Sequence, residues 1–234
     1  MIVSINQPAY LPWLGYFHRI AISDLHIVLD HVQFEKNSFT NRNKIRMKQG
    51  WTWLTVPVKT KGRFPELSIN QLEIADDPHW AKKHLSTLQM SYSRALFFRK
   101  HATEFEKVYS QHWNRFIDLL RETTGYLLEA FGIKTRIIYS SEMDVKGQKA
   151  ELISNLCKAV GATVYVSGPL GKGYLHEQSF RQAGMRVAYH NYMHPIYPQV
   201  FPNFEPYMSA VDLLFNCGPK SLDIIMKDQE RISE

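Results

Sequence analysis

The first thirty residues follow a strand, loop, helix and strand order that few folds accommodate. MIVSIN (1–6) is short, apolar and rich in β-branched residues, and Gln7 with the following proline ends it abruptly. Apolar residues at helical spacing run over 14–22, and LHIVLD (25–30) predicts a second buried strand. Because such a unit closes a parallel strand pair, we expect the loop after the first strand at the carboxyl edge of the sheet, where ligands collect.

The same alternation returns after a helical middle section. Strand and helix patterns alternate from TRIIYSSE (135–142) to MRVAYHNYM (185–193), and the chain ends in helical patterns. We therefore predict an α/β fold with a mostly parallel Rossmann-like sheet and flanking helices. The chain is expected to form a single domain, 1–234, with a helical insertion at about 78–131.

Two segments interrupt the alternation. VQFEKNSFTNRNKIR and WTWLTVPVK alternate apolar and polar residues around Gly50, which predicts a hairpin. In the middle section Pro78 begins a helix, and helical periodicity is unbroken over 104–131 until Gly132.

Composition limits the class of partner. The chain has 234 residues, 44% hydrophobic content and a net charge of +6, enough for a full core and a bias toward anions. Lys and Arg are spread along the chain without a nucleic-acid recognition motif, so we expect a phosphate-bearing small molecule rather than nucleic acid. No segment resembles a secretion signal or approaches the ~20 apolar residues of a membrane span, which predicts a cytoplasmic protein. The oligomeric state stays open.

The two cysteines, Cys157 and Cys217, lie in apolar stretches and are expected as buried free thiols. Two cysteines exclude a four-cysteine zinc site, and we predict no metal site. The sequence also lacks GxSxG and HExxH motifs, so nothing indicates a serine hydrolase or a zinc protease.

The first polar cluster, INQPAYLPWLGYF, places Gln7, Tyr10 and Tyr16 in a stretch stiffened by two prolines. One interpretation is a rigid, packed corner, since large rings bury well. The other is a ligand site, because buried polar tips need partners. A stiff corner would hold Gln7 and Tyr10 beside a ligand, since pre-positioned groups need rigid support.

The Asn41-Arg42-Asn43 triplet is short and typical of a surface turn. Arg42 nevertheless offers a planar fork of donors suited to phosphate or carboxylate. The triplet is therefore a second candidate for ligand binding.

A glycine-rich stretch, SGPLGKGYL, contains Ser167, Gly168, Lys172 and Tyr174. Its glycines would let backbone N–H groups surround an anion at the end of a strand, and Lys172 adds charge. The spacing is not that of a P-loop, so a Walker-type nucleotide site is not indicated, and a plain flexible loop is the alternative.

The stretch HPIYPQVF carries His194, Tyr197 and Gln199. His194 is either a general base or a satisfied imidazole in the core. The following SAVD matches a capping box, in which Ser209 caps a helix and Asp212 reaches back to its N-terminus.

Together these motifs resemble the WbqC-like family of bacterial proteins. The resemblance rests on QPAYLPWLGYF, SDLHIVLDHVQF, NRNKI, WLTVPV, YVSGPLGKGYL, HPIYPQVF and SAVDLLFNCGP, in this order along most of the chain. The set is specific, although single motifs such as NRN are weak and 80–126 is less diagnostic. Two positions depart from the commonest family pattern, Asn6 where many members have His and His176 where Asp is frequent.

The family is associated with gene clusters for surface polysaccharides such as O-antigens, and its chemistry is poorly defined. The resemblance implies transfer of an acyl or aminoacyl group to the amine of a nucleotide-linked amino sugar. The donor would be acyl-CoA or a carrier-protein thioester. In this hypothesis His194 is the general base, Asp24 or Asp30 orients it, and Arg42 and Lys172 hold the pyrophosphate.

Two alternatives belong to other functional classes. The opening strand, loop, helix and strand are reminiscent of nucleotidyltransferases acting on phosphorylated small molecules, but their paired loop histidines are missing and His18 lies inside the helix. A non-catalytic partner protein in glycan assembly would instead present the aromatic corner of Tyr10, Trp13 and Tyr16 as an exposed surface.

Overall fold

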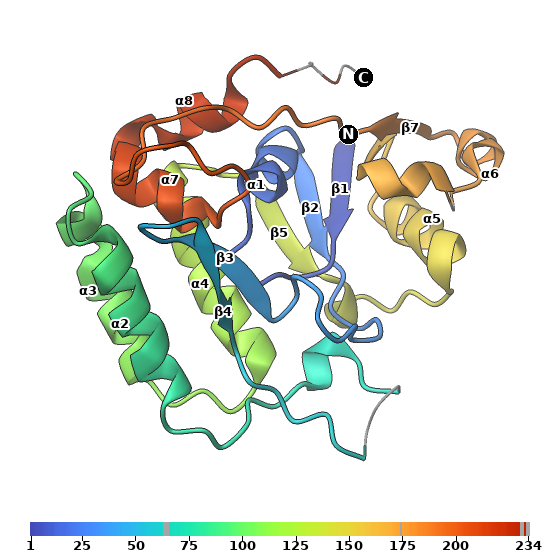
Figure 1. The fold of residues 1–234 in the computed structure, drawn as a ribbon. Coiled ribbons are helices and arrows are strands. Elements are labelled where there is room, and N and C mark those ends of the chain that lie inside the picture. Colours follow the sequence, from blue (N-terminus) through green and yellow to red (C-terminus); the bar gives the residue numbers. More distant parts are fainter. Residues whose placement is uncertain (63–65, 174, 230–231, 233–234) are drawn as a thin grey trace.

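The computed structural model describes residues 1–62, 66–173, 175–229 and 232, and it is built around a five-stranded sheet (Figure 1). The strand order is β5-β2-β1-β6-β7, and every neighbouring pair is parallel. The predicted α/β fold with a Rossmann-like sheet is confirmed. The strands are β1 (Ile2–Asn6), β2 (Leu25–Val28), β5 (Arg136–Tyr139), β6 (Val164–Ser167) and β7 (Arg186–Tyr189).

Helices cover both faces of the sheet, and each face has its own apolar core. Val3 and Ile5 of β1 point toward α5 and α6, whereas the Ser4 hydroxyl contacts the backbone of α1 on the other face. Helix α4 (Phe116–Phe131) lies beside α1, and α7 and α8 contact these two helices. The helices are α1 (Leu14–Ala21), α5 (Lys149–Ala159), α6 (Glu177–Gln182), α7 (Ala210–Cys217) and α8 (Ser221–Met226).

The order of the strands reverses at β1. From β1 the chain moves to β2 and β5 on one side, and only later to β6 and β7 on the other. The carboxyl ends of β1 and β6 are therefore neighbours whose loops leave in opposite directions, and open α/β sheets bind ligands at such a switch point. Extending the register of Ser4 opposite Val166 by two residues places Asn6 beside Gly168.

The middle section contains α2 (Trp80–Tyr92), α3 (Phe98–Ser110) and α4 (Phe116–Phe131). The unbroken helix predicted over 104–131 is wrong. The chain is extended at Gln111, and Asn114 accepts a backbone hydrogen bond from Ile74 (2.9 Å), a tertiary pairing that the periodicity does not reveal. Gly132 ends α4 in a left-handed conformation (φ 74°), as predicted.

The predicted hairpin is present as β3 (Arg42–Arg46) and β4 (Trp51–Thr55). The strand predicted over 185–193 ends at Tyr189, and no helix or strand is formed between there and Ser209. Both cysteines are buried and free, as predicted. Among the helices of the described residues, none has the length and apolar character needed to cross a membrane.

Candidate functional site at the carboxyl edge of the sheet

The end of β1 places a buried polar group without a partner at the switch point. Asn6 is 7% exposed, and its Nδ2 has no hydrogen-bond partner among the described residues. Its backbone carbonyl accepts from the N–H of Leu29 (2.7 Å), which fixes the strand end. A buried amide left unpaired costs about 1–3 kcal/mol, so it marks a position where a ligand acceptor would be stabilising. Gln7 is exposed at the same edge.

The loop after β6 folds tightly back on the strand end, and two glycines permit this. A Cβ at Gly171 would lie 2.0 Å from Oγ of Ser167, and a Cβ at Gly168 would lie 2.7 Å from Nη1 of Arg19 on α1. The Arg19 guanidinium therefore lies against the loop, which also carries the exposed Lys172. Arg19 and Lys172 give this loop a positive surrounding that suits a phosphate group.

Two buried histidines meet at the neighbouring strand end. His190 directly follows β7, and its Nε2 lies 2.7 Å from Nδ1 of His18 on α1. The N–H of His190 donates to the carbonyl of Ser167 (2.8 Å), which ties the pair to β6. Burial lowers the pKa of His18 to about 4, and burial followed by Arg19 and His18 lowers the pKa of His190 to about 3. Both imidazoles are therefore neutral at pH 7.

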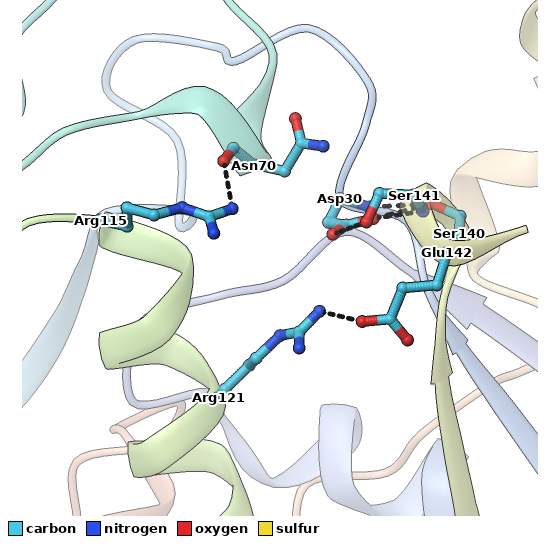
Figure 2. Close-up of polar contacts among 7 residues, drawn as sticks. All are labelled: Asp30, Asn70, Arg115, Arg121, Ser140, Ser141 and Glu142. Carbon is cyan, nitrogen blue, oxygen red and sulfur yellow. Dashed lines mark hydrogen bonds and ion pairs between the residues drawn. The ribbon is translucent and has the colours of Figure 1, made fainter.

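The ends of β2 and β5 carry a second polar cluster, shown in Figure 2. Asp30 is 1% exposed, and its carboxylate accepts from the hydroxyl of Ser140 (3.1 Å) and from the hydroxyl and N–H of Ser141 (2.7 and 2.9 Å). The Ser140 hydroxyl also lies 2.6 Å from Nδ1 of His31. These contacts join the ends of β2 and β5, so the Asp30 carboxylate helps to hold the carboxyl edge of the sheet together.

Two arginines from the start of α4 point toward this cluster (Figure 2). Nη2 of Arg121 lies 2.5 Å from Oε1 of Glu142, and its guanidinium stacks on the ring of Tyr139 at 3.6 Å. Arg115 donates to the carbonyl of Asn70 (3.3 Å). At these strand ends the Arg121 charge is therefore paired with the Glu142 carboxylate, and Arg115 is held by a backbone carbonyl.

Comparison with known proteins places these features in one family. The model of the WbqC-like protein family matches residues 7–224. The chain belongs to the WbqC-like protein family. The match runs from the loop after β1 into α8, so it covers both clusters at the sheet edge except Asn6.

A relative of this WbqC-like protein is the uncharacterized protein Rv1507c of Mycobacterium tuberculosis. It is 37% identical over 225 residues, which covers 95% of this chain and 96% of that protein. No solved structure matches the chain.

The aromatic corner is largely interior. Tyr10 is fully buried, and its hydroxyl bonds to Nδ1 of His84 (2.9 Å) and to the hydroxyl of Tyr109. Tyr16 is 6% exposed on the inner side of α1, and only Trp13 is partly exposed. The exposed aromatic surface required by the non-catalytic hypothesis is therefore reduced to one ring.

The residues of the Asn41-Arg42-Asn43 triplet hold the hairpin and the corner together. Asn43 is buried, and its Nδ2 donates to the carbonyl of Leu11 (2.7 Å), a residue in the left-handed region at φ 43°. The Asn41 amide donates to a backbone carbonyl after β4 (2.9 Å). Arg42 stacks on the ring of Trp53 at 4.3 Å. These contacts support the packed-corner interpretation.

The predicted residues before α7 make hydrogen bonds to the backbone of their own segment or to Asp212 on α7. The ring nitrogens of His194 lie 3.0 and 3.1 Å from backbone groups of its own segment, which occupies both. The Tyr197 hydroxyl and the Gln199 amide each donate to Oδ2 of Asp212 at 2.8 Å. Ser209 caps α7 as predicted, but the interpretation of Asp212 as a capping partner is wrong, because its carboxylate faces these two side chains.

Asp24 falls outside this arrangement. Oδ2 of Asp24 accepts from the N–H of Ile2 (2.7 Å), at the amino edge of the sheet and so opposite the strand ends that form the candidate site. Tyr174 lies outside the described residues. His176 is exposed at the start of α6.

Sequence reasoning missed three residues of the edge, His18, His190 and Arg19, and noted Asn6 only as a departure from the family pattern. A signal was present for two of them. His18 is a polar residue on an otherwise apolar helix side, and His190 directly follows a strand, where ligand-binding groups gather.

Proposed function

We propose that this WbqC-like protein binds a nucleotide-linked amino sugar across the switch point and transfers an acyl group to the sugar amine. The observation that carries the proposal is the buried amide of Asn6, which has no partner among the described residues and ends β1 beside β6, whose following loop contains Gly168 and Lys172 and lies against Arg19 of α1. A pyrophosphate matches the two cations and the backbone of this loop. The substrate class, a nucleotide-linked amino sugar, comes from the polysaccharide setting that the family resemblance implies.

In the proposed reaction the amine nitrogen attacks the carbonyl carbon of an acyl thioester. The C–N bond forms, the C–S bond breaks, and the proton lost by the amine ends on the departing thiolate. A general base must hold that proton in between. The neutral pair of His18 and His190 ranks ahead of His194 for this role, because the backbone already occupies both ring nitrogens of His194.

The same histidine pair favours nucleotidyl transfer as a second candidate. In that reaction an oxygen of a phosphorylated small molecule attacks the α-phosphorus of a nucleoside triphosphate, and pyrophosphate leaves. Arg19 and Lys172 would neutralise the charge on the leaving group. The order β5-β2-β1-β6-β7 places the loop after β1 at the switch point, as this chemistry requires.

Isothermal calorimetry tests the proposal, with UDP-glucosamine as the probe and UDP and glucosamine as controls. We expect saturable binding of UDP-glucosamine that Asn6→Leu weakens by roughly tenfold, the value of one hydrogen bond to a ligand. Silence with every sugar nucleotide would overturn the proposal. Release of pyrophosphate from a triphosphate and a sugar phosphate, without binding of UDP-glucosamine, would replace it with the second candidate.

A further inference from the structure

A small cavity of about 120 Å³ lies between α1, α4, β2 and β5. An apolar cavity of about 150 Å³ holds a benzene molecule, so this one holds a group of about four or five heavy atoms. Its walls are largely apolar and are formed by Ile20, Val28, Leu128, Ile137 and the rings of Tyr16 and Tyr139. None of the residues of the switch-point loop lines it.

One buried polar atom on the cavity wall has no protein partner. His26 is 0% exposed and lines the cavity, and its Nε2 has no hydrogen-bond partner among the described residues. Its other nitrogen, Nδ1, lies 2.8 Å from the hydroxyl of Ser4, which in turn lies 2.8 Å from the hydroxyl of Ser23. The Ser4 hydroxyl has two possible acceptors, Nδ1 at 2.8 Å and the carbonyl of Arg19 at 3.3 Å, and we assign its proton to the shorter contact, which puts the imidazole proton on Nε2. Nε2–H of His26 is then a donor on the inner wall of a cavity that the Arg121 side chain also lines.

This imidazole is neutral. Burial, followed by the charge of Arg19, lowers the pKa of His26 to about 3. A neutral N–H in apolar surroundings favours an uncharged acceptor such as a carbonyl oxygen. It disfavours an ammonium group, which would be desolvated without a counter-charge.

Helix α4 leaves an approach to the cavity at Gly125. A Cβ built at Gly125 meets nothing within 4 Å, although glycine is unfavourable in a helix interior. Gly125 and Arg121, one helical turn apart, line both the cavity and a surface depression of about 450 Å³. The Arg121 guanidinium is paired with Glu142 (Figure 2) and stacks on the ring of Tyr139, which also lines the cavity. The missing side chain at 125 therefore opens the cavity toward solvent.

We propose that this cavity receives the acyl group of the donor, as a short uncharged chain of about two to four carbons whose carbonyl oxygen accepts from Nε2–H of His26. The inference rests on the proposed acyl transfer and narrows it. Simple short acyl groups are selected, whereas long chains exceed the volume and aminoacyl groups would bury an ammonium.

Propanamide tests this inference, because it has the chain and the carbonyl but no reactive thioester. It is titrated into the whole protein while histidine-side-chain and backbone ¹⁵N shifts are followed. We expect saturable shifts at His26 and along α4, and none with propylammonium or decanamide. Absence of saturation with propanamide, or equal binding of propylammonium, would overturn the inference.

A matched pair of variants tests the route. Gly125→Phe places a ring over the approach and should weaken propanamide binding by more than tenfold, whereas Gly125→Ala should leave it unchanged. His26→Phe keeps an aromatic ring without the donor and should weaken binding by about tenfold. Undiminished binding in both Gly125→Phe and His26→Phe would disprove the site. If His26→Phe does not fold, the comparison of Gly125→Phe with Gly125→Ala tests the site instead.

Failure of this inference is distinguishable from failure of the proposed function. Binding of UDP-glucosamine without propanamide binding removes the acyl cavity and keeps the sugar-nucleotide site. Binding of propanamide that depends on His26, without any sugar nucleotide, keeps a site for short acyl groups and removes the proposed acceptor.

Discussion

The switch-point edge and the segment between β7 and α7 are both rich in polar residues, but they use them differently. Tyr197 and Gln199 of the segment both donate to Oδ2 of Asp212 on α7 at 2.8 Å, so these side chains are held by the fold. Of these three residues only Asp212 keeps a buried side-chain atom, Oδ1, without a partner among the described residues. At the edge, Nδ2 of Asn6 and Nε2 of His18 are buried without a partner among the described residues. Hydrogen-bonded polar groups stabilise a fold, whereas buried polar groups without partners lower its stability and are expected at functional positions.

The largest expected effect is a loss of stability, because Arg46 holds the hairpin to the segment between β7 and α7. Arg46 is 2% exposed, and its guanidinium donates to the carbonyls of Gly50 (2.7 Å), Pro202 and Asn203 (both 2.8 Å). Arg46→Ala leaves these acceptors unpaired and should lower the free energy of unfolding by about 3–5 kcal/mol. Urea denaturation measures it. If Arg46→Ala were stable but no longer bound a sugar nucleotide, Arg46 would serve binding rather than the fold, and the contrast between the two regions would fail.

The pH dependence of stability gives the next effect. Burial raises the pKa of Asp212 from 3.8 to about 6, and hydrogen bonds from Tyr197 and Gln199 offset part of the shift. The folded protein therefore binds an extra proton between these values. The contribution of Asp212 to stability is complete below pH 4 and is lost as pH rises to 6, by roughly 3 kcal/mol.

Asp212→Asn keeps an acceptor and removes the charge. Relative to this variant, the unmodified protein should lose stability between pH 4 and 6, as measured by urea denaturation across the window. A constant difference between the two proteins would show that Asp212 does not titrate there.

The fold follows from local patterns, but the site depends on distant pairings. Short apolar runs such as residues 1–6 and the helix stop at Gly132 are visible in the sequence because they act over a few neighbours. The hydroxyls that donate to the Asp30 carboxylate belong to Ser140 and Ser141, which lie 110 and 111 residues further along the chain. His18 meets its partner 172 positions away. No local pattern records such a contact.

The same limit explains why His194 attracted a catalytic interpretation. A histidine that precedes a proline and has two tyrosines nearby in the sequence has the composition of a site, and only the structure shows that backbone groups occupy both ring nitrogens. Polar density in a sequence therefore predicts where polar groups gather but not whether they remain available.

His194→Ala separates the two roles of this residue. A general base should lose turnover by roughly two to four orders of magnitude with an unchanged unfolding curve. The observed contacts instead predict a loss of about 1–2 kcal/mol in the free energy of unfolding with turnover retained. Denaturation and acyl transfer measured on one preparation decide, and the first outcome would make the segment before α7 part of the active site.

Asn6→Leu should change stability and binding in opposite directions. Removing a buried unpaired amide should raise the free energy of unfolding by about 1 kcal/mol, and losing the donor should weaken UDP-glucosamine binding by roughly tenfold. Gln7→Leu at the exposed neighbouring position is the control, and it should leave the free energy of unfolding unchanged. A destabilised Asn6→Leu variant would show that the amide has a structural partner, and the contrast between the two regions would fail.

The smallest expected effect concerns Lys172, whose ammonium is exposed and lies 5.3 Å from the ring of Tyr189. Solvent screens an exposed charge, so Lys172→Met should weaken UDP-glucosamine binding only about threefold, and less at 0.5 M salt. Arg19 is less exposed and lies against Gly168, so Arg19→Met should have a larger and less salt-sensitive effect. Calorimetry at two salt concentrations compares them. Equal, salt-independent losses would place the pyrophosphate between both side chains, deeper in the loop than the exposed Lys172 suggests.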